Sequence, residues 1–452
     1  MTSRQTSPAL ARSLGLFDAT MINVGIIVGS GIFLVPSSIA SRLDSSLLNL
    51  TAWIIAGLFS LLGALTIAEL GALFPEAGGM FVYLKEAYGP LWGFLYGWSL
   101  FLVIQTASIA AVAVAFASYF GYFVHLSSLK VKIVAVATIL VLSLINYLGV
   151  RWGAWTQNVF TLAKVGALVV LLLLSFQSGS GKIANFNPLL PAAAAGSWIG
   201  SFGLALLAAL WCYDGWIQAC YVAGEIKDPE RNLPLSMISS ALIILVIYLS
   251  INFAYIFVLS VAGVARSELV AADMAKTFLG FHGAGLIALL VMLSTFGSDN
   301  GMILAGARVY YAMAKEKLFF QRAATVHPKF LTPSFALGFQ AVWSCVLVFS
   351  GTYEQLFTYV IFVEFLFYGL CAAAVLVLRR KRAGLFRPYK TWGYPVVPIL
   401  FILFTGLLLI NTLWNNLRDA AIGTLLLLSG LPAYWFWRKK SGFKSDDETV
   451  LE

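Results

Sequence analysis

Charged side chains are scarce in this sequence of 452 residues. Asp, Glu, Lys and Arg make up 11% of the chain, whereas a soluble domain carries about 25%. Hydrophobic residues make up 60%, and the mean hydropathy is +0.88. Because a water-soluble globule could not bury so much apolar surface, the composition excludes most soluble proteins. The apolar residues recur in runs of about 20, the length that crosses a bilayer, and they predict an all-α integral membrane protein.

The sequence lacks the residues and motifs that several kinds of chemistry require. The four cysteines lie in apolar runs, and the sequence has neither a CxxC pair nor a His/Cys metal spacing. The three histidines fall in predicted loops, which makes a histidine proton relay improbable. A GxxxxGK[ST] loop is missing too, which excludes an ATP-driven pump within this chain. We therefore expect no enzyme, no metal and no cofactor.

Twelve segments are long and apolar enough to be predicted as transmembrane helices. They lie at about 15–40, 47–74, 91–124, 131–149, 153–176, 198–223, 236–261, 283–313, 333–350, 355–378, 396–414 and 418–437. Of the 29 Lys and Arg residues, 21 fall on the side that holds both termini, 7 on the other side, and Lys164 within a span. This bias predicts that residues 1–14 and 439–452 are cytoplasmic. The net charge of +9 is spread over short loops, so nucleic acid is not an expected partner.

Two of these segments are interrupted in the middle. The first contains Gly25 and then Gly29-Ser30-Gly31, and the sixth contains the run from Trp211 to Trp216 with Asp214 inside it. Mid-helix glycine weakens a helix by about 1 kcal/mol, and a carboxylate at bilayer depth costs more. Each interruption opens a run of five predicted spans, a pattern typical of inverted-repeat transporters with a site at the membrane midplane. Close helix packing through a GxxxG spacing is the alternative for Gly25 and Gly29.

Five motifs in the right order resemble the amino acid–polyamine–organocation (APC) superfamily, and within it the L-type amino acid transporter (LAT) branch with its bacterial members. They are Gly29-Ser30-Gly31-Ile32-Phe33, the segment 68–79 (AELGALFPEAGG), Tyr213-Asp214-Gly215-Trp216, the segment 224–234 (GEIKDPERNLP), and Ser298–Gly301 with Arg308-Val309-Tyr310. The resemblance covers about residues 12–390. It implies a LeuT-type fold of 12 transmembrane helices with 5+5 inverted repeats and two broken helices. The repeats would be 15–178 and 198–380, with 395–438 peripheral.

The first break predicts a binding site for an amino acid. Breaking a helix frees N–H groups with partial positive charge at one new end and C=O groups at the other. A carboxylate would dock on the N–H groups around Ser30, Gly31 and Ile32, while an ammonium would meet carbonyls near Ile27 and Trp211–Asp214. By resemblance, the family binds the α-amino and α-carboxyl groups at both breaks, through the positions Ile27, Gly29, Ser30, Gly31, Trp211, Cys212, Tyr213 and Gly215.

Three of the residues at the second break have alternative interpretations. Trp211 would close over the substrate from outside, or be an ordinary core or belt residue. Cys212 would line the side-chain pocket, or serve only as a small buried hydrophobe. Asp214 would attract a cationic side chain, or, more simply, cap a second half-helix by accepting its free N–H groups.

Lys164 is the most informative single residue because it lies in the middle of the fifth span. It shares a helix face with Gln157 and Thr161 at i, i+4 and i+7. The resemblance places it where sodium-coupled relatives bind sodium, beside the hydroxyls of Ser294, Thr295 and Ser298. A fixed ammonium there would replace the cation and predicts sodium-independent transport. The alternatives are a lysine that snorkels to the interface, and proton coupling through a lysine that loses its proton.

The other charged residues in or near the predicted spans support weaker predictions. Glu69, Glu225 and Arg308 would form a cytoplasmic gate, or be solvated charges at helix ends. Asp299 and Glu364 lie deeper and would only satisfy polar neighbours. The run 379–382 (RRKR) is a topology anchor that would also contact anionic membrane lipids.

The sequence thus predicts a plasma-membrane carrier that moves small-molecule L-amino acids by alternating access, most simply a sodium-independent exchanger of neutral amino acids. The alternative is proton-coupled uptake of cationic amino acids or polyamines, which would follow if Asp214 faces the pocket. An ion channel would need a ring of carbonyls or like charges around a pore, and no segment offers one. The loop 125–132 has no cysteine, whereas animal relatives use one there to link a heavy chain, so no disulfide-linked partner is expected.

Overall fold

The fold comes from a computed structural model that describes residues 10–190, 198–280, 282–350, 353–415 and 417–441. In these ranges the chain is helical, without a strand, and a single β-bridge joins Leu14 to Ile226. The α-helices are α1 (Leu16–Ile27), α2 (Gly31–Ala40), α3 (Ser46–Leu73), α4 (Met80–Tyr88), α5 (Pro90–Ser99), α6 (Gln105–Phe120), α7 (Ser128–Tyr147), α8 (Val150–Gln177), α9 (Trp198–Cys212), α10 (Pro229–Leu259), α11 (Val261–Arg266), α12 (Val270–Leu279), α13 (His282–Lys315), α14 (Ser334–Ser350), α15 (Tyr353–Lys381), α16 (Val396–Asn415), α17 (Leu417–Leu428) and α18 (Gly430–Ser441). A π-helical turn, η1 (Leu100–Ile104), joins α5 to α6, and short 3-10 turns are η2 (Ile183–Phe186), η3 (Gln218–Cys220), η4 (Ala223–Glu225) and η5 (Gln321–Ala324).

The lengths of these helices fit a multi-pass membrane protein. Within the described ranges nine helices are long and apolar enough to cross a bilayer, and the pair α1–α2, bent by 44°, would make a tenth. The parts of α9 from Gly200 and α14 are apolar but shorter. Each predicted span therefore contains at least one helix in the described ranges.

The start of the seventh predicted span differs clearly from its prediction. The segment predicted from 236 begins at Pro229, because proline suits the first turn of a helix, where its missing N–H would have no partner. The polar residues 230–232 lie in this first turn, although their polarity favoured a loop.

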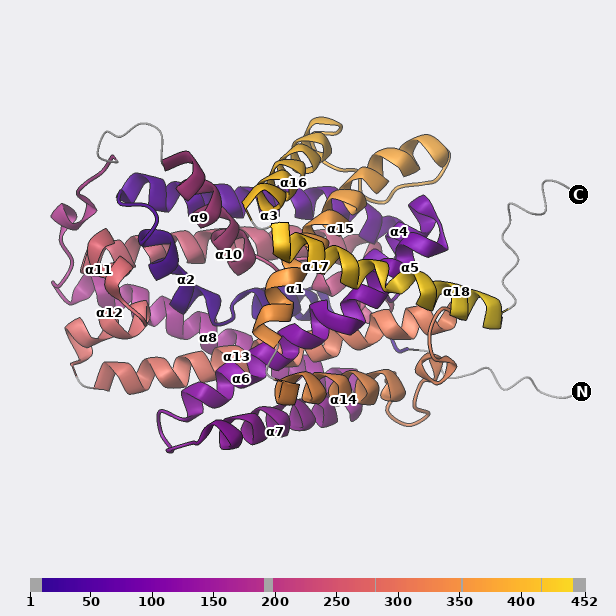
Figure 1. Cartoon of the computed structure of the whole chain (residues 1–452), viewed down its shortest axis with the longest axis horizontal. Helices are drawn as coiled ribbons and strands as arrows, with labels where there is room; N and C mark the ends of the chain where they lie inside the picture. Colours follow the sequence, from indigo (N-terminus) through magenta and orange to yellow (C-terminus); the bar gives the residue numbers. More distant parts are fainter. Residues whose placement is uncertain (1–9, 191–197, 281, 351–352, 416, 442–452) are drawn as a thin grey trace, which may run out of the picture.

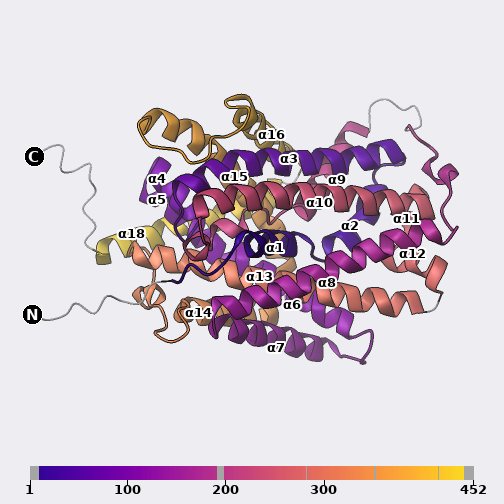
Figure 2. The same cartoon turned by 180° about the vertical axis from the view of Figure 1, so that it is seen from behind.

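The helices lie side by side, with α1 in the centre of the bundle. Here α1 packs against α8, α10 and α13, as the view from behind shows (Figure 2). On one flank α7 packs against α14, and on the opposite flank α16 packs against α3 and α15 (Figure 1). The described chain begins and ends at the same end of the molecule, which α4, α5 and α18 mark in Figure 1. We call this end the termini end.

The two predicted breaks have different structures. The first span is broken as predicted, since α1 ends at Ile27 and α2 begins at Gly31. In the sixth span α9 ends at Cys212, but the prediction that a helix continues to residue 223 is wrong. Turns begin directly after α9 at Tyr213 and lead to the 3-10 turns η3 and η4, and within them Gly215 has a φ of +117°. A side chain at Gly215 would be strained at this φ, and its Cβ would lie 2.9 Å from Cγ2 of Ile26.

Candidate functional site

The end of α1 exposes carbonyl groups that the helix itself cannot satisfy. The last carbonyls of any helix have no intrahelical partner. Here the carbonyl of Val28 accepts hydrogen bonds from the hydroxyls of Ser294 at 2.7 Å and Ser298 at 3.0 Å. The carbonyl of Gly25 accepts one from Ser298 at 2.8 Å. Both serines lie on α13, which is why α1 and α13 pack closely at the break.

The amino group of Lys164 completes this carbonyl cluster. Its Nζ lies 2.5 Å from the carbonyl oxygen of Gly25, 2.7 Å from that of Val28, 3.0 Å from that of Ser294 and 3.0 Å from Oγ of Ser298. The side chain is completely buried, so the alternative of a lysine that snorkels to the interface is wrong. An ammonium has three protons, and here they are shared among four oxygens that come from two helices.

Two details of the predicted cluster change. Ser294 contributes its carbonyl to Lys164 and its hydroxyl to Val28. Thr295 does not join the cluster, because its hydroxyl donates to the carbonyls of Val291 and Met292 one turn earlier in α13. As predicted, Gln157 and Thr161 share the buried face of α8 with Lys164.

The glycines of the first break serve different purposes. A Cβ at Gly25 would lie 2.0 Å from Nε2 of Gln157 and 2.2 Å from Oγ1 of Thr161, so Gly25 allows α8 to approach α1. A Cβ at Gly29 would have its nearest contact at 3.7 Å, which is ordinary van der Waals distance. A Cβ at Gly31 would lie 2.9 Å from Sγ of Cys212, so Gly31 allows α9 to approach α2. Close packing therefore accounts for Gly25 and Gly31.

A cavity of about 390 Å³ lies against the break. Its walls come from α1, α2, α6, α13 and the end of α9. Seven predicted site residues line it: Ile27, Gly29, Ser30, Gly31, Trp211, Asp214 and Ser298. Ile32, Cys212, Tyr213 and Gly215 lie outside its lining, the first three as buried neighbours that support it. A cavity of about 450 Å³ near α11 and α12 contains none of the predicted residues.

Sequence reasoning missed one wall of the cavity. Ser108, Ala111, Val112 and Ala115 line it from α6, and Met302 lines it from α13. The residues on α6 recur at i, i+3, i+4 and i+7, so they form one face of that helix. Such a stripe of small residues was a readable signal, but ordinary helix packing produces the same pattern.

At the second break a carboxylate meets a tyrosine. Asp214 lines the cavity, and its Oδ1 accepts a hydrogen bond of 2.5 Å from the hydroxyl of Tyr368 on α15. The same hydroxyl oxygen lies 3.3 Å from Oε1 of Glu364, one turn earlier in α15. Because no α-helix lies between Cys212 and Pro229, the prediction that Asp214 caps a second half-helix is wrong.

The other deep carboxylate has no such partner. Asp299 is completely buried in α13, and neither of its oxygens has a hydrogen-bond partner among the residues that the structure describes. The expectation that Asp299 satisfies polar neighbours is therefore wrong.

Tyrosines on α10 were also missed. The hydroxyl of Tyr248 donates to the carbonyl of Ile27 at 2.8 Å, and that of Tyr255 lies 3.3 Å from the carbonyl oxygen of Ile32. The ring of Tyr213 packs against Trp53 and Tyr248, with centroids 6.1 Å and 5.0 Å away. These aromatic residues hold α10 and α3 against the two breaks.

A buried ion pair lies at the termini end. Arg308 on α13 donates from Nε to Glu225 at 2.6 Å and from Nη2 at 3.1 Å, and both side chains are completely buried. The backbone carbonyl of Glu225 also accepts hydrogen bonds from the N–H groups of Ser13 and Leu14. The interpretation of these two side chains as solvated end charges is wrong.

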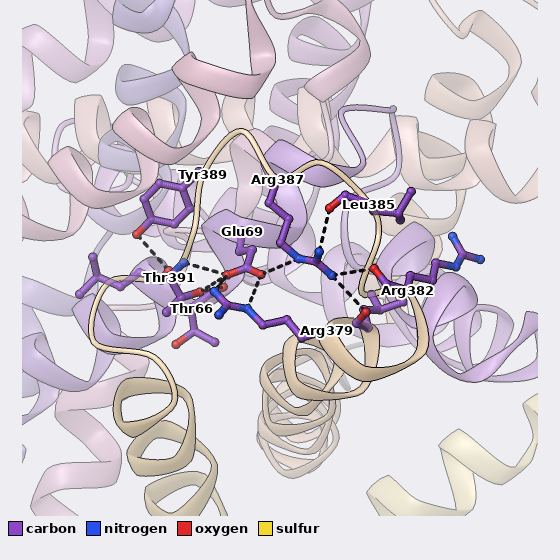
Figure 3. Close-up of polar contacts among 10 residues, drawn as sticks. Thr66, Glu69, Arg379, Arg382, Leu385, Arg387, Tyr389 and Thr391 are labelled. Carbon is purple, nitrogen blue, oxygen red and sulfur yellow. Dashed lines mark hydrogen bonds and ion pairs between the residues drawn. The ribbon is translucent and has the colours of Figure 1, made fainter.

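Glu69 belongs to a separate ionic cluster, shown in Figure 3. Its carboxylate accepts two hydrogen bonds from Arg379, at 2.8 Å and 2.6 Å, and others from the backbone N–H and the hydroxyl of Thr391 (Figure 3). Nε of Arg387 lies 3.2 Å from the same carboxylate. The three predicted gate residues are therefore divided between two clusters, one joining η4 to α13 and the other joining α3 to α15.

A third group of charges surrounds α4. Lys85 pairs with Glu316 at 2.9 Å and lies 3.4 Å from Glu86, which pairs in turn with Arg382 at 2.8 Å. Burial alone would lower the pKa of Lys85, but the hydrogen bond to Glu316 and the two carboxylates raise it above its ordinary value. At the termini end, ion pairs thus join α3, α4, α13 and α15.

Comparison with known proteins agrees with this architecture. The amino acid permease family profile matches residues 14–435. The serine/threonine exchanger SteT of Bacillus subtilis (strain 168) is 33% identical over 436 residues, which are 95% of this chain and 98% of that protein. The human b(0,+)-type amino acid transporter 1 is 32% identical over 440 residues, covering 95% of this chain and 88% of the relative. The human large neutral amino acids transporter small subunit 2 is 33% identical over 452 residues, covering 97% and 83%. The chain therefore belongs to the amino acid permease family, a group of membrane transporters within the APC superfamily.

Proposed function

We propose that this protein is a sodium-independent amino acid exchanger of the plasma membrane, with neutral amino acids as its main substrates. The observation that carries the proposal is the buried ammonium of Lys164 among the oxygens of Gly25, Val28, Ser294 and Ser298, next to the cavity. The relative whose name states a mechanism, SteT, is a serine/threonine exchanger.

The substrate would bind along the first break. Its carboxylate would accept hydrogen bonds from the first N–H groups of α2, at Gly31 and Ile32, where the helix dipole favours negative charge. The carbonyl of Ile27 already accepts from Tyr248 and from the N–H of Gly29. We therefore place the substrate's ammonium on another carbonyl of the first break, such as that of Ile26.

The fixed charge of Lys164 would replace a coupling cation. Four oxygens around one centre at 2.5–3.0 Å resemble the oxygen set that holds a small cation. With an ammonium in this position, no further cation fits, and loading would not require sodium. Transport would then be driven by the gradients of the exchanged amino acids.

The ion pairs at the termini end would serve as the gate for alternating access. We place this end in the cytoplasm, as the distribution of Lys and Arg predicts. The pair Arg308–Glu225 and the cluster around Glu69 tie α13, η4, α3 and α15 together, so the cavity can open to this side only if these contacts part. Residues 15–178 and 198–380 would be the inverted repeats that rock against each other, with 395–438 at the periphery.

Asp214 favours a second candidate, transport of cationic amino acids. Its carboxylate lines the cavity next to Trp211, where a side-chain ammonium or guanidinium could meet both a negative charge and an indole ring. One relative is named a b(0,+)-type amino acid transporter and another a large neutral amino acids transporter. The names of the relatives therefore do not decide between the two classes of substrate.

We expect the chain to work without a disulfide-linked heavy chain. Its four cysteines, Cys212, Cys220, Cys345 and Cys371, are all free, and none lies in the loop 125–132. Membrane lipids would be its other partners.

Uptake into proteoliposomes tests the proposal directly. Labelled serine, leucine and lysine would be supplied in sodium-free buffer to vesicles with or without internal amino acid. We expect uptake that depends on internal amino acid and is unchanged when sodium replaces choline. Uptake into empty vesicles that needs a sodium or proton gradient would instead show a symporter and overturn the role given to Lys164. Flux that is independent of amino acid on the opposite side would indicate a channel.

A further inference from the structure

Two carboxylates share a single tyrosine hydroxyl beside the cavity. Tyr368 donates to Asp214 at 2.5 Å, and its hydroxyl oxygen lies 3.3 Å from Glu364. A tyrosine hydroxyl has only one proton, and the shorter of the two contacts assigns it to Asp214. With that proton directed to Asp214, the oxygen of Tyr368 can hydrogen-bond to Glu364 only by accepting a proton that Glu364 carries. The chain of hydrogen bonds then runs from Glu364 through Tyr368 to Asp214.

Among the residues that the structure describes, the contacts of this chain of hydrogen bonds include no compensating positive charge. Trp216 packs on Tyr368 with ring centroids 5.4 Å apart, and Phe59 on α3 packs on Phe365 at 6.1 Å. The titratable groups nearby are Tyr96 on α5 and Tyr221 after η3, whose hydroxyls are hydrogen-bonded to each other. Phe401 faces this region from α16, η1 contains no titratable side chain, and the titratable residue of α6, Tyr119, lines the other cavity near α11 and α12.

Within the described ranges, no Lys, Arg or His is hydrogen-bonded to or ion-paired with Asp214 or Glu364. The buried cation of the first break, Lys164, is already engaged by four oxygens. Two like charges this close in apolar surroundings repel strongly, so such a pair retains one proton between its members.

We propose that Glu364 is a positioning residue that holds this one proton and, through Tyr368, sets the charge that Asp214 presents to the cavity. When a cationic side chain binds at Asp214, Glu364 releases its proton to solvent. The charges balance: the resting pair carries one negative charge, and the ionised pair with the bound cation again carries one net negative charge. A neutral amino acid leaves the proton in place. This inference rests on the proposed function, since it concerns the side-chain end of the same cavity.

The proposal implies that a proton and a cationic substrate compete, because the binding of one is thermodynamically linked to the release of the other. If binding of the substrate expels one proton, its apparent affinity rises with pH by up to about tenfold per unit over the range in which the pair releases the proton. A neutral substrate that expels no proton shows no such slope. The ratio of cationic to neutral uptake therefore reports the protonation state of Glu364.

The test compares labelled lysine with labelled threonine in proteoliposomes between about pH 5.5 and pH 8.5, near the titration range of a perturbed carboxylate. For the wild-type protein we expect the half-saturating lysine concentration to fall by up to about tenfold per pH unit, while that of threonine stays constant. In Glu364→Gln the lysine slope should disappear. Glu268→Gln, which changes an exposed glutamate, is the matched control and should keep the wild-type slope. Equal slopes for the two substrates, or a wild-type slope in Glu364→Gln, would overturn the inference.

A second measurement does not depend on the folding of a variant. Lysine added to the wild-type protein in weakly buffered detergent solution with a pH indicator should release about one proton per bound lysine, and threonine none. Binding of lysine without proton release would overturn the inference. Uptake of threonine without any uptake or binding of lysine would overturn it too, while neutral amino acid exchange would stand. If no amino acid were taken up at all, the proposed function itself would fall, and this inference with it.

Discussion

The two breaks next to the cavity hold ionisable groups of opposite kind. At the first, the carbonyls at the end of α1 surround the ammonium of Lys164, and the N-terminus of α2 continues the span. At the second, α9 ends without a following α-helix, and the charged group is the carboxylate of Asp214. The first break therefore satisfies its carbonyls with a cation that belongs to the protein. The second presents a negative charge to the cavity, where a ligand or a proton can neutralise it.

In the proposed function, this difference would give the two breaks separate tasks. The first offers helix N–H groups and carbonyls, which every amino acid can use through its α-carboxylate and α-ammonium. The second offers Trp211 and Asp214, which would meet the side chain. Changes at the first break should therefore affect all substrates alike, whereas changes at the second should affect substrates selectively.

The largest effect is expected from Lys164→Met, which removes the charge of the first break. Hydrogen bonds from a charged group contribute about 1.5–3 kcal/mol each, so exchange should fall by more than about 100-fold for every substrate. Lys182→Met, which changes an exposed lysine after the end of α8, is the control. The measurement is exchange in proteoliposomes, with and without sodium. Unchanged uptake kinetics in Lys164→Met would contradict the assigned role, and activity restored by sodium would show that an ion can occupy the vacated position.

Packing at the first break is tested by two alanine substitutions. Gly25→Ala would place a methyl group 2.0 Å from Nε2 of Gln157, so we expect a loss of about 1–3 kcal/mol and a lower melting temperature in detergent. Gly29→Ala has its nearest contact at 3.7 Å and should melt close to the wild-type temperature. If both variants melted alike, close packing would not be the reason for Gly25.

At the second break, Asp214→Asn should change selectivity. Removing its charge should lower uptake of lysine relative to threonine by about tenfold, because a charge-assisted hydrogen bond contributes about 1.5–3 kcal/mol and a tenfold change corresponds to about 1.4 kcal/mol. Asp44→Asn, at an exposed aspartate, is the matched control. If uptake of lysine and of threonine fell by the same factor, Asp214 would stabilise the structure of the break and would not contact the substrate's side chain.

Local sequence signals predicted the first break better than the second. Gly29-Ser30-Gly31 marks a backbone interruption by composition alone, and α1 and α2 end and begin beside it. At the second break, Tyr213-Asp214-Gly215 marks the interruption equally well, but the conformation of residues 216–228 depends on tertiary packing. These residues form turns, bends, 3-10 helix and the β-bridge at Ile226, an outcome that apolar periodicity does not distinguish from α-helix.

Partners distant in sequence were the least predictable. That Lys164 lies in the middle of a span is evident from counting residues, and its depth accounts for its burial. Which arginine pairs with Glu69 is not evident, because Arg379 and Glu69 are brought together only by the packing of α15 on α3. For the same reason the link from Asp214 to Glu364 through Tyr368 was not foreseen, although both carboxylates were noted individually.

The smallest effect is expected from two tyrosine substitutions, each of which removes a single hydroxyl group from one of the two breaks. The hydroxyl of Tyr248 donates to the carbonyl of Ile27 at the first break, whereas that of Tyr213 at the second break is buried without a hydrogen-bond partner among the described residues. Tyr248→Phe should therefore lose about 1 kcal/mol of stability, a typical net value for one hydrogen bond. Tyr213→Phe removes an unsatisfied polar atom and should be neutral or slightly stabilising. Melting temperatures in detergent measure both, and a greater loss in Tyr213→Phe would show that the second break holds a partner for this hydroxyl, such as a buried water.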